Sequence, residues 1–262
     1  MESLLTFIVL GCFSGVIAGL LGVGGGLVIV PILSALLLIS GVSTELVVHI
    51  AIGTSLATII PTSISSAWAH HKHKAVLWHV VIRITPGIII GALLGAWLAD
   101  WLASAQLRNV FACFEFTVAA WMIWGHAPNK ARETISAATY GFAGLVIGSI
   151  SSLLGIGGGT LTVPFLTWSG TPLPKAIGSS AACGLPIAIA GAFGFVLTGI
   201  NETGLPDYSS GYLYWPAFVG ISVASVVFAP IGAKLAHRLP VPALKKVFAG
   251  FLVLLGVKML LG

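Results

Sequence analysis

A glycine-rich motif of twelve residues occurs twice in this chain and constrains its fold more than any other feature. The first copy, LLGVGGGLVIVP, runs from Leu20 to Pro31, and the second, LLGIGGGTLTVP, runs from Leu153 to Pro164. Both copies stand inside long apolar stretches. A motif that returns after 133 residues in the same surroundings indicates two copies of one structural unit.

Two further stretches repeat in the same order, so the duplication extends over the whole chain. AIGTSLATIIP matches AIGSSAACGLP, and LRNVFACF matches LKKVFAGF. The first pair begins at Ala51 and Ala176, and the second pair begins at Leu107 and Leu244. We therefore predict a first membrane repeat at residues 1–127 and a second at residues 134–262, joined by a cytoplasmic linker at residues 128–133.

The composition places these repeats in a membrane. Only 7% of the residues are charged and 57% are hydrophobic, whereas soluble domains have about 25% charged residues. Several apolar stretches reach the ~20 residues that cross a bilayer, and they are continuous rather than alternating. The sequence predicts an all-α polytopic membrane protein. Its net charge of +5 lies mostly in short loops, which argues against a nucleic-acid partner.

Each repeat has four apolar segments, and the first segment of each is too long for one crossing. At 1.5 Å per residue, about 35 residues would span about 52 Å, against a hydrocarbon core of ~30 Å. The glycine motif must therefore break that segment into two pieces. The segments are expected at 4–39, 45–67, 76–101 and 105–125, and again at 134–170, 174–199, 212–236 and 243–261.

Loops at equivalent places in the two repeats differ in charge. The loop after the second segment is HHKHKA in the first repeat, with Lys72 and Lys74, and the Lys-free, Arg-free NETGLPDYSS in the second. Because basic loops stay on the cytoplasmic side, the second repeat is predicted to be inverted relative to the first. The prediction is about eight transmembrane segments in two inverted repeats, with glycine-broken or re-entrant segments at the midplane and both termini outside.

The glycine motifs are candidate anion sites. Inverted repeats with interrupted helices are typical of secondary transporters, whose substrate site lies near the midplane. The helix that restarts after each motif directs free N–H groups and a positive dipole end back at the glycines. Close helix packing through small residues is the alternative. The candidate substrate-binding glycines are Gly24, Gly25, Gly26, Gly157, Gly158 and Gly159.

GLLGVGGGLVIVP, its second copy and KAIGSS resemble the TauE/SafE family of membrane permeases, the sulfite exporters. The resemblance covers essentially the whole chain. It implies a multi-pass protein of a prokaryotic plasma (inner) membrane that exports small sulfur-containing anions such as sulfite, sulfoacetate or related organosulfonates. The family's His-Lys-Ala lead into the second motif is split here, since the first copy has His49 and Ile50 but only the second copy has the lysine, Lys175.

Five polar side chains next to these motifs are further candidates for substrate binding. Lys175 precedes Ser179 and Ser180 in the second repeat, and Thr54 and Ser55 are the first-repeat equivalents of the serines. Hydroxyls can donate to an anion, and a lysine would offset its charge. The alternative for the lysine is an interfacial side chain that reaches water.

Three ionisable residues inside apolar segments are candidates for ion coupling. Arg83 and Glu115 are expected at similar depth on antiparallel helices, where they would form an ion pair. The alternative is an arginine that snorkels to the cytoplasm and a protonated acid. His49 is the third candidate, with a packing role as its alternative.

Other kinds of site are not indicated by the sequence. The HHKHK run at 70–74 has no carboxylate or cysteine nearby, which favours contact with lipid headgroups over a zinc site. The three cysteines suggest no disulfide framework. No catalytic constellation is recognisable, so the prediction is a non-enzyme with no cofactor or metal. Its partners would be a small anion and the lipid bilayer, with a homodimer left open. A cation or metal transporter, or an intramembrane enzyme, is the alternative function.

Overall fold

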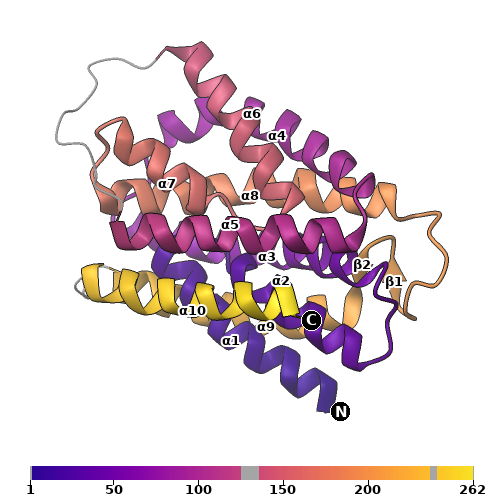
Figure 1. Cartoon of the computed structure of the whole chain (residues 1–262). Coiled ribbons are helices and arrows are strands. Elements are labelled where there is room, and N and C mark those ends of the chain that lie inside the picture. The colour runs from indigo at the N-terminus through magenta and orange to yellow at the C-terminus, as the bar shows by residue number, and fades with distance from the viewer. Residues whose placement is uncertain (1, 125–135, 237–240, 262) are drawn as a thin grey trace.

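The structure is a computed structural model that describes residues 2–124, 136–236 and 241–261, and their side chains except at 2, 3 and 241–248. The predicted linker at 128–133 lies outside the described residues. Within them, the chain forms ten α-helices and one short β hairpin (Figure 1). The helices confirm the prediction of an all-α polytopic membrane protein. The number of transmembrane segments and the inversion of the repeats stay predictions.

Five helices come from each repeat of the sequence. The first repeat forms α1 (Glu2–Leu21), α2 (Gly26–Ile39), α3 (Val47–Lys72), α4 (Trp78–Asp100) and α5 (Ser104–Trp124). The second forms α6 (Ala137–Leu153), α7 (Gly159–Trp168), α8 (Leu173–Thr198), α9 (Trp215–Ala236) and α10 (Val241–Leu261), with β1 (Ser209–Ser210) and β2 (Leu213–Tyr214) between α8 and α9.

Both glycine motifs interrupt a helix, as the segment lengths predict. The breaks fall between α1 and α2 and between α6 and α7. Four glycines at the breaks have φ between 67° and 85°: Gly22, Gly24, Gly25 and Gly155. This left-handed region is open to glycine at little cost and disfavours other residues. The motif sequence therefore determines where each helix ends.

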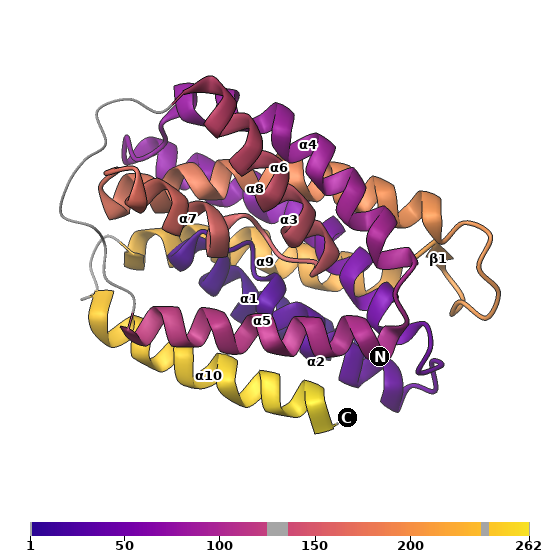
Figure 2. The ribbon, with the colours of Figure 1, turned by 45° about the horizontal axis from the view of Figure 1, so that its top comes forward.

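The heaviest helix packing joins one repeat to the other. α1 packs along α9, and α4 packs along α6, so the first helix of each repeat lies on the fourth helix of its partner repeat. α3 packs on α8 in the middle, and α5 lies beside α10 along one side in both views (Figures 1 and 2). The first and fourth helices of each repeat thus pack on the fourth and first helices of the other repeat.

Glycines at four-residue spacing allow this close packing. A Cβ atom on Gly87, Gly91 or Gly95 of α4 would overlap main-chain atoms of α6, and one on Gly144 or Gly148 of α6 would overlap those of α4. Small residues are the usual means by which membrane helices approach closely. α1 presents an equivalent row to α9: Gly11, Gly15 and Gly19.

Among the described residues, five helices are long and apolar enough to cross a membrane by length and composition: α1, α3, α4, α8 and α9. Shorter apolar helices are α2, α6 and the part of α10 from Ala249 to Leu261. α3 is the most enclosed of the five spans, with 83% of its apolar window buried. The broken helices lie against the central pair of helices: α2 contacts α3, and α7 contacts α8.

Candidate substrate site

The two glycine motifs cross each other in direct backbone contact. A Cβ atom on Gly24 would lie 3.0 Å from the Cα atom of Gly157, and one on Gly157 would lie 2.9 Å from the Cα atom of Gly24. On either side, Gly26 faces the carbonyl of Gly155, and Gly159 faces that of Gly22.

These contacts give four of the six predicted site glycines a packing reason. Gly24, Gly26, Gly157 and Gly159 have no room for a side chain, because it would collide with the backbone of the opposite motif. The two motifs run antiparallel through the crossing, so the relation between them is reciprocal. Close packing, the alternative to anion binding, thus explains these four glycines without a ligand.

Gly25 and Gly158 directly precede the restarted helices and differ from each other. Gly25 has φ 85°, which itself favours glycine. Gly158 has φ −61°, and a Cβ atom there would meet only side-chain atoms at 2.9 Å, Cδ1 of Ile187 and Oγ1 of Thr162. The position of Gly158 is therefore the less constrained of the two by the backbone.

Backbone donors collect at the start of α7. The N–H groups of Leu161 and Thr162 bond the carbonyl oxygen of Gly158 at 3.3 and 2.7 Å. The N–H groups of Gly159 and Thr160 come before them and have no acceptor within their own helix. α2 begins in the same way after its own glycines. Both helices therefore direct positive dipole ends at the crossing, as the sequence predicts.

Ser55 and Ser180 each contact the glycine motif of the other repeat. Oγ of Ser55 donates to the carbonyl of Gly155 at 2.7 Å. Oγ of Ser180 lies 3.4 Å from the carbonyl of Gly22 and donates more closely, at 2.8 Å, to Ile177 in its own helix. The two serines occupy equivalent places in the sequence repeat, so this contact is also reciprocal.

Thr54 and Ser179 accept hydrogen bonds from the opposite repeat. The N–H of Tyr214 donates to Oγ1 of Thr54 at 3.0 Å, and the N–H of Leu77 donates to Oγ of Ser179 at 2.9 Å. A hydroxyl that accepts one bond still has its own proton to donate. The predicted substrate contacts of these four hydroxyls stay predictions, and their observed partners are backbone groups.

A second set of hydroxyls surrounds the second motif, and the repeated motifs do not indicate it. Ser151 and Ser152 end α6, and Thr160 and Thr162 begin α7; all four are at most 5% exposed. None of their oxygens has a hydrogen-bond partner among the described residues. Buried hydroxyls without partners are uncommon, and each one calls for a ligand, a water or another explanation.

These unpartnered hydroxyls have no counterparts in the first repeat. The residues 133 positions earlier are Ala18, Gly19, Leu27 and Ile29. Comparing the two motif copies position by position would have found Thr160 and Thr162, because threonines replace aliphatic residues there. Among the described residues, the unpartnered buried hydroxyls next to the glycine motifs therefore belong to the second repeat.

Lys175 is exposed, unlike the buried serines that follow it in α8. It stands in the first turn of α8 and is exposed, whereas Ser179 and Ser180 are fully buried. The described contacts do not bring its ammonium group to the glycine motif. Its predicted role in binding the anion stays a prediction, and its position fits the interfacial alternative.

The predicted ion pair between Arg83 and Glu115 is wrong. Arg83 is exposed on α4, while Glu115 on α5 is fully buried, with no partner for either carboxylate oxygen among the described residues. The reason is the helix order, because α5 packs on α10 and not on α4. A Cβ atom on Gly256 of α10 would lie 3.5 Å from Oε2 of Glu115.

His49 occupies a packed and hydrogen-bonded position near the start of α3. Its Nε2 donates to the carbonyl of Ala99 at 3.0 Å, and its Nδ1 lies 3.0 Å from Oγ of Ser104. The ring stacks on Tyr212 with centroids 5.1 Å apart. These contacts join α3 to the ends of α4 and α5, which supports the packing role for this histidine.

The basic loop after α3 contains aromatic and cationic side chains in contact. Nζ of Lys72 lies 3.3 Å from the ring centroid of Trp68, and Nε1 of Trp78 donates to Nδ1 of His71 at 3.1 Å. Across the described residues, no three His, Cys, Asp or Glu side chains are grouped to bind a metal ion. The predicted contact of this loop with lipid headgroups stays a prediction.

The comparisons with known proteins agree with the fold and the motifs. Residues 7–259 match the model of a family described as sulfite exporter TauE/SafE. A probable membrane transporter protein of Haemophilus influenzae is 39% identical over 261 residues, covering 98% of this chain and 99% of that relative. No solved structure matches the chain.

More distant relatives also align from end to end. A probable membrane transporter protein of Methanocaldococcus jannaschii is 28% identical over 97% of this chain and 94% of its own length. A probable membrane transporter protein of Bacillus subtilis is 25% identical over 98% of this chain and 97% of its own length. Because the family match takes in nearly the whole chain, and a full-length relative supports it, this protein belongs to the sulfite exporter TauE/SafE family of membrane transporters.

Proposed function

We propose that this transporter is a secondary exporter of small sulfur-containing anions, such as sulfite, sulfoacetate or related organosulfonates, in a prokaryotic plasma membrane. The family description supports the substrate class. The binding chemistry is supported by the donors at the glycine crossing, where two helices begin and where buried hydroxyls have no partner in the described part of the chain.

The observation that favours the proposal most is the set of unpartnered hydroxyls on the second repeat. Ser151, Ser152, Thr160 and Thr162 are buried donors beside the N-terminus of α7. Oxygen atoms of a sulfite or sulfonate group accept hydrogen bonds, and N–H groups at a helix start add a favourable dipole. Our proposed substrate site is therefore asymmetric, with most of its donors from the second repeat.

We also propose that the two repeats are inverted in the membrane. The reciprocal packing of α1 on α9 and α4 on α6 supports a two-fold relation between the repeats. In Figures 1 and 2 both labelled termini lie toward the end of the bundle that has the β hairpin, in keeping with termini and hairpin on the outside. Re-entrant α2 and α7 would then meet at the midplane.

For the coupling ion we propose a proton carried by Glu115. Intramembrane ionisable side chains commonly mark proton pathways in transporters. Glu115 is the buried carboxyl among the described residues, and its two oxygens are unpartnered between α5 and α10. A cation substrate is less well supported, since hard cations such as Mg²⁺ and Ca²⁺ bind through several oxygen ligands, and the described interior offers a single buried carboxyl.

Flux into proteoliposomes tests the proposed function. We expect labelled sulfite or sulfoacetate to cross faster than sulfate, and a pH gradient to increase the rate. Thr162→Val should lower transport at least tenfold without loss of folded protein, because it removes a buried donor. Thr167→Val is the matched control, since its hydroxyl bonds Val163 in the same helix. Equal flux of all anions, or unchanged transport by Thr162→Val, would contradict the proposal.

A further inference from the structure

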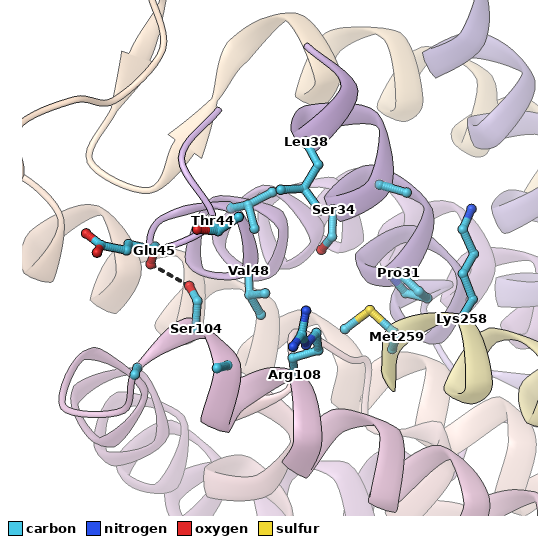
Figure 3. A pocket seen from close by; sticks show the side chains of 14 residues that line it. Pro31, Ser34, Leu38, Thr44, Glu45, Val48, Ser104, Arg108, Lys258 and Met259 are labelled. Atoms are coloured by element: carbon cyan, nitrogen blue, oxygen red, sulfur yellow. Dashed lines mark hydrogen bonds between the residues drawn. The ribbon is translucent and has the colours of Figure 1, made fainter. Parts of the chain in front are cut away.

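A pocket of about 620 Å³ lies away from the glycine crossing, among four helix ends. Its walls come from the C-terminal half of α2, the start of α3, the start of α5 and the last turn of α10 (Figure 3). Small-molecule pockets typically have volumes of about 300–1,000 Å³. The pocket is therefore large enough for a ligand much bigger than a bare oxyanion.

Arg108 extends into this pocket, and no described residue hydrogen-bonds its Nε atom. Figure 3 shows its guanidinium group in the space between Val48, Ser34 and Met259. Its Nε atom is buried and has no hydrogen-bond partner among the described residues. A guanidinium group presents a rigid fork of donors that matches phosphate and carboxylate oxygens, so an unpaired one in a pocket calls for an anion.

The other charges of the pocket reinforce this preference. Lys258 lines the α10 wall and adds a second cation to the pocket, although Figure 3 shows that its ammonium group does not point toward Arg108. Glu45 is the pocket's acidic residue, and Figure 3 shows its carboxylate pointing away from Arg108, while its carbonyl accepts a hydrogen bond from Oγ of Ser104. α3 and α5 begin at this pocket, and helix N-termini favour negative charge.

Most of the remaining wall is apolar. Pro31 and Leu38 of α2, Val48 of α3 and Met259 of α10 line it. An inorganic anion would leave this surface in contact with water, whereas a chain of methylene groups would cover it. The combination of a cationic end and an apolar wall fits a molecule that has both an oxyanion and an apolar part.

We propose that this pocket binds an amphiphilic oxyanion, a sulfonate or phosphate group with an apolar chain. The oxyanion lies on the guanidinium of Arg108, with Lys258 adding positive charge, and the chain lies along Leu38, Val48 and Met259. A soluble alkanesulfonate and the headgroup of an anionic phospholipid share this chemistry. The site is separate from the glycine crossing, so it does not depend on which anion the protein transports.

Binding of alkanesulfonates to the purified full-length protein in neutral detergent tests the site by calorimetry. From methanesulfonate to hexanesulfonate, affinity should rise roughly fourfold per buried methylene group. Arg108→Gln should weaken hexanesulfonate binding about tenfold to a hundredfold, and Arg108→Lys should recover part of this loss. Arg83→Gln, which removes an exposed arginine from α4, is the matched control.

Native mass spectrometry identifies the source of the ligand in the membrane. If the occupant is a lipid, the parent protein retains phosphatidylglycerol in preference to phosphatidylcholine, Arg108→Gln loses this preference, and hexanesulfonate displaces the lipid. If the occupant is a soluble anion, alkanesulfonates bind and the lipid preference is absent. Affinity independent of chain length, or equal binding of every ligand by the parent and Arg108→Gln, overturns the proposal. Met259→Ala provides a second check, because it should reduce the gain per methylene group while keeping both cations.

Discussion

Gly24 and Gly157 face each other so closely that neither has room for a methyl group. A Cβ atom on either glycine would lie within 3.0 Å of the Cα atom of the other. The two residues are equivalent in the sequence repeat, 133 positions apart. The two glycine motifs are therefore related to each other about this contact. The glycines next to it differ in whether they can be replaced by a larger residue.

Gly157→Ala and Gly158→Ala should have opposite effects on stability and transport. The added methyl group at Gly157 collides with the backbone of Val23 and Gly24, so we expect a loss of about 1–3 kcal/mol of folding free energy. At Gly158 it meets side-chain atoms only, Cδ1 of Ile187 and Oγ1 of Thr162 at 2.9 Å and Cβ of Cys183 at 3.7 Å, and the Ile187 and Thr162 side chains can change rotamer. Thermal unfolding in detergent should show that Gly157→Ala is destabilised and that Gly158→Ala is as stable as the parent. Flux assays should show that Gly158→Ala transports the anion more slowly than the parent. Equal stability of the two variants would refute the backbone collision.

Ser55→Ala should destabilise the protein more than Ser180→Ala. It removes the donor to a buried carbonyl, that of Gly155, at a cost of about 1–3 kcal/mol. Ser180 has only a long contact to Gly22, and its shorter bond is local to α8. Ser40→Ala, which removes an exposed bond within α2, is the control and should change the free energy of unfolding by less than about 0.5 kcal/mol. The reverse order would contradict the greater contribution expected from the bond between Ser55 and Gly155.

Glu115→Gln should remove the response to a pH gradient while keeping anion exchange at equal pH. The amide has a similar shape but cannot carry a proton. Because Arg83 is exposed on α4 and α5 packs on α10, exchanging the two charges should give no rescue. Flux with and without a gradient measures the first effect. Restored transport in the charge-exchanged variant would re-establish the pairing that the helix order rules out.

Single cysteines on the two loops that follow α3 and α8 should react from opposite sides of the membrane. Thr203→Cys and His73→Cys are suitable because both positions are exposed, and Cys113, an exposed native thiol, should first be replaced by serine. With an impermeant maleimide, we expect Thr203→Cys to label from outside and His73→Cys only after the membrane is opened. Labelling of both from one side would rule out inverted repeats.

Stability should fall at alkaline pH because of Tyr212. Burial, and then the charge of Asp100, raise the pKa of Tyr212 above its usual range, and its hydroxyl lies 3.3 Å from Oδ1 of Asp100. A group whose pKa is raised by folding stabilises the fold below its unfolded pKa of about 10 and loses this contribution as the pH rises toward the folded value. Tyr212→Phe should cost about 0.5–1.5 kcal/mol near pH 8 and flatten the loss above pH 10. Unfolding curves between pH 7 and 11 measure both effects, and an unchanged pH profile would speak against them.

The helices were largely predictable because lipid makes length and hydropathy decisive. The predicted segment 76–101 is observed as Trp78–Asp100, and 174–199 as Leu173–Thr198. The breaks were predictable as well, since no single helix of the predicted length fits the hydrocarbon core. Helix partners were not, because α5 could have packed on α4 or α10 without any change in its own pattern, and the predicted pairing of Arg83 with Glu115 depended on that choice.

The location of the candidate substrate site could be predicted from the sequence, but most of its residue contacts could not. The motifs locate the glycine crossing, but that Gly24 touches Gly157 follows only from the arrangement of both repeats. Ser55 looks equally suited to an anion and to a carbonyl, and only the structure shows it bonded to Gly155. Identity between the copies does not point to Thr160 and Thr162, because at these positions the difference between the copies is informative.

The exchange of packing partners between the repeats also affects how the protein is made. A ribosome delivers α1 early, yet the helix that covers its row of glycines, α9, begins only at Trp215. At about 5–20 residues per second, synthesis of the intervening chain takes roughly 10–40 s. Until then the glycine face of α1 borders lipid or an insertion factor. α1 can therefore pack on α9 only after most of the chain has been synthesised. By contrast, α6 is synthesised soon after α5, so α4 can pack on α6 much earlier.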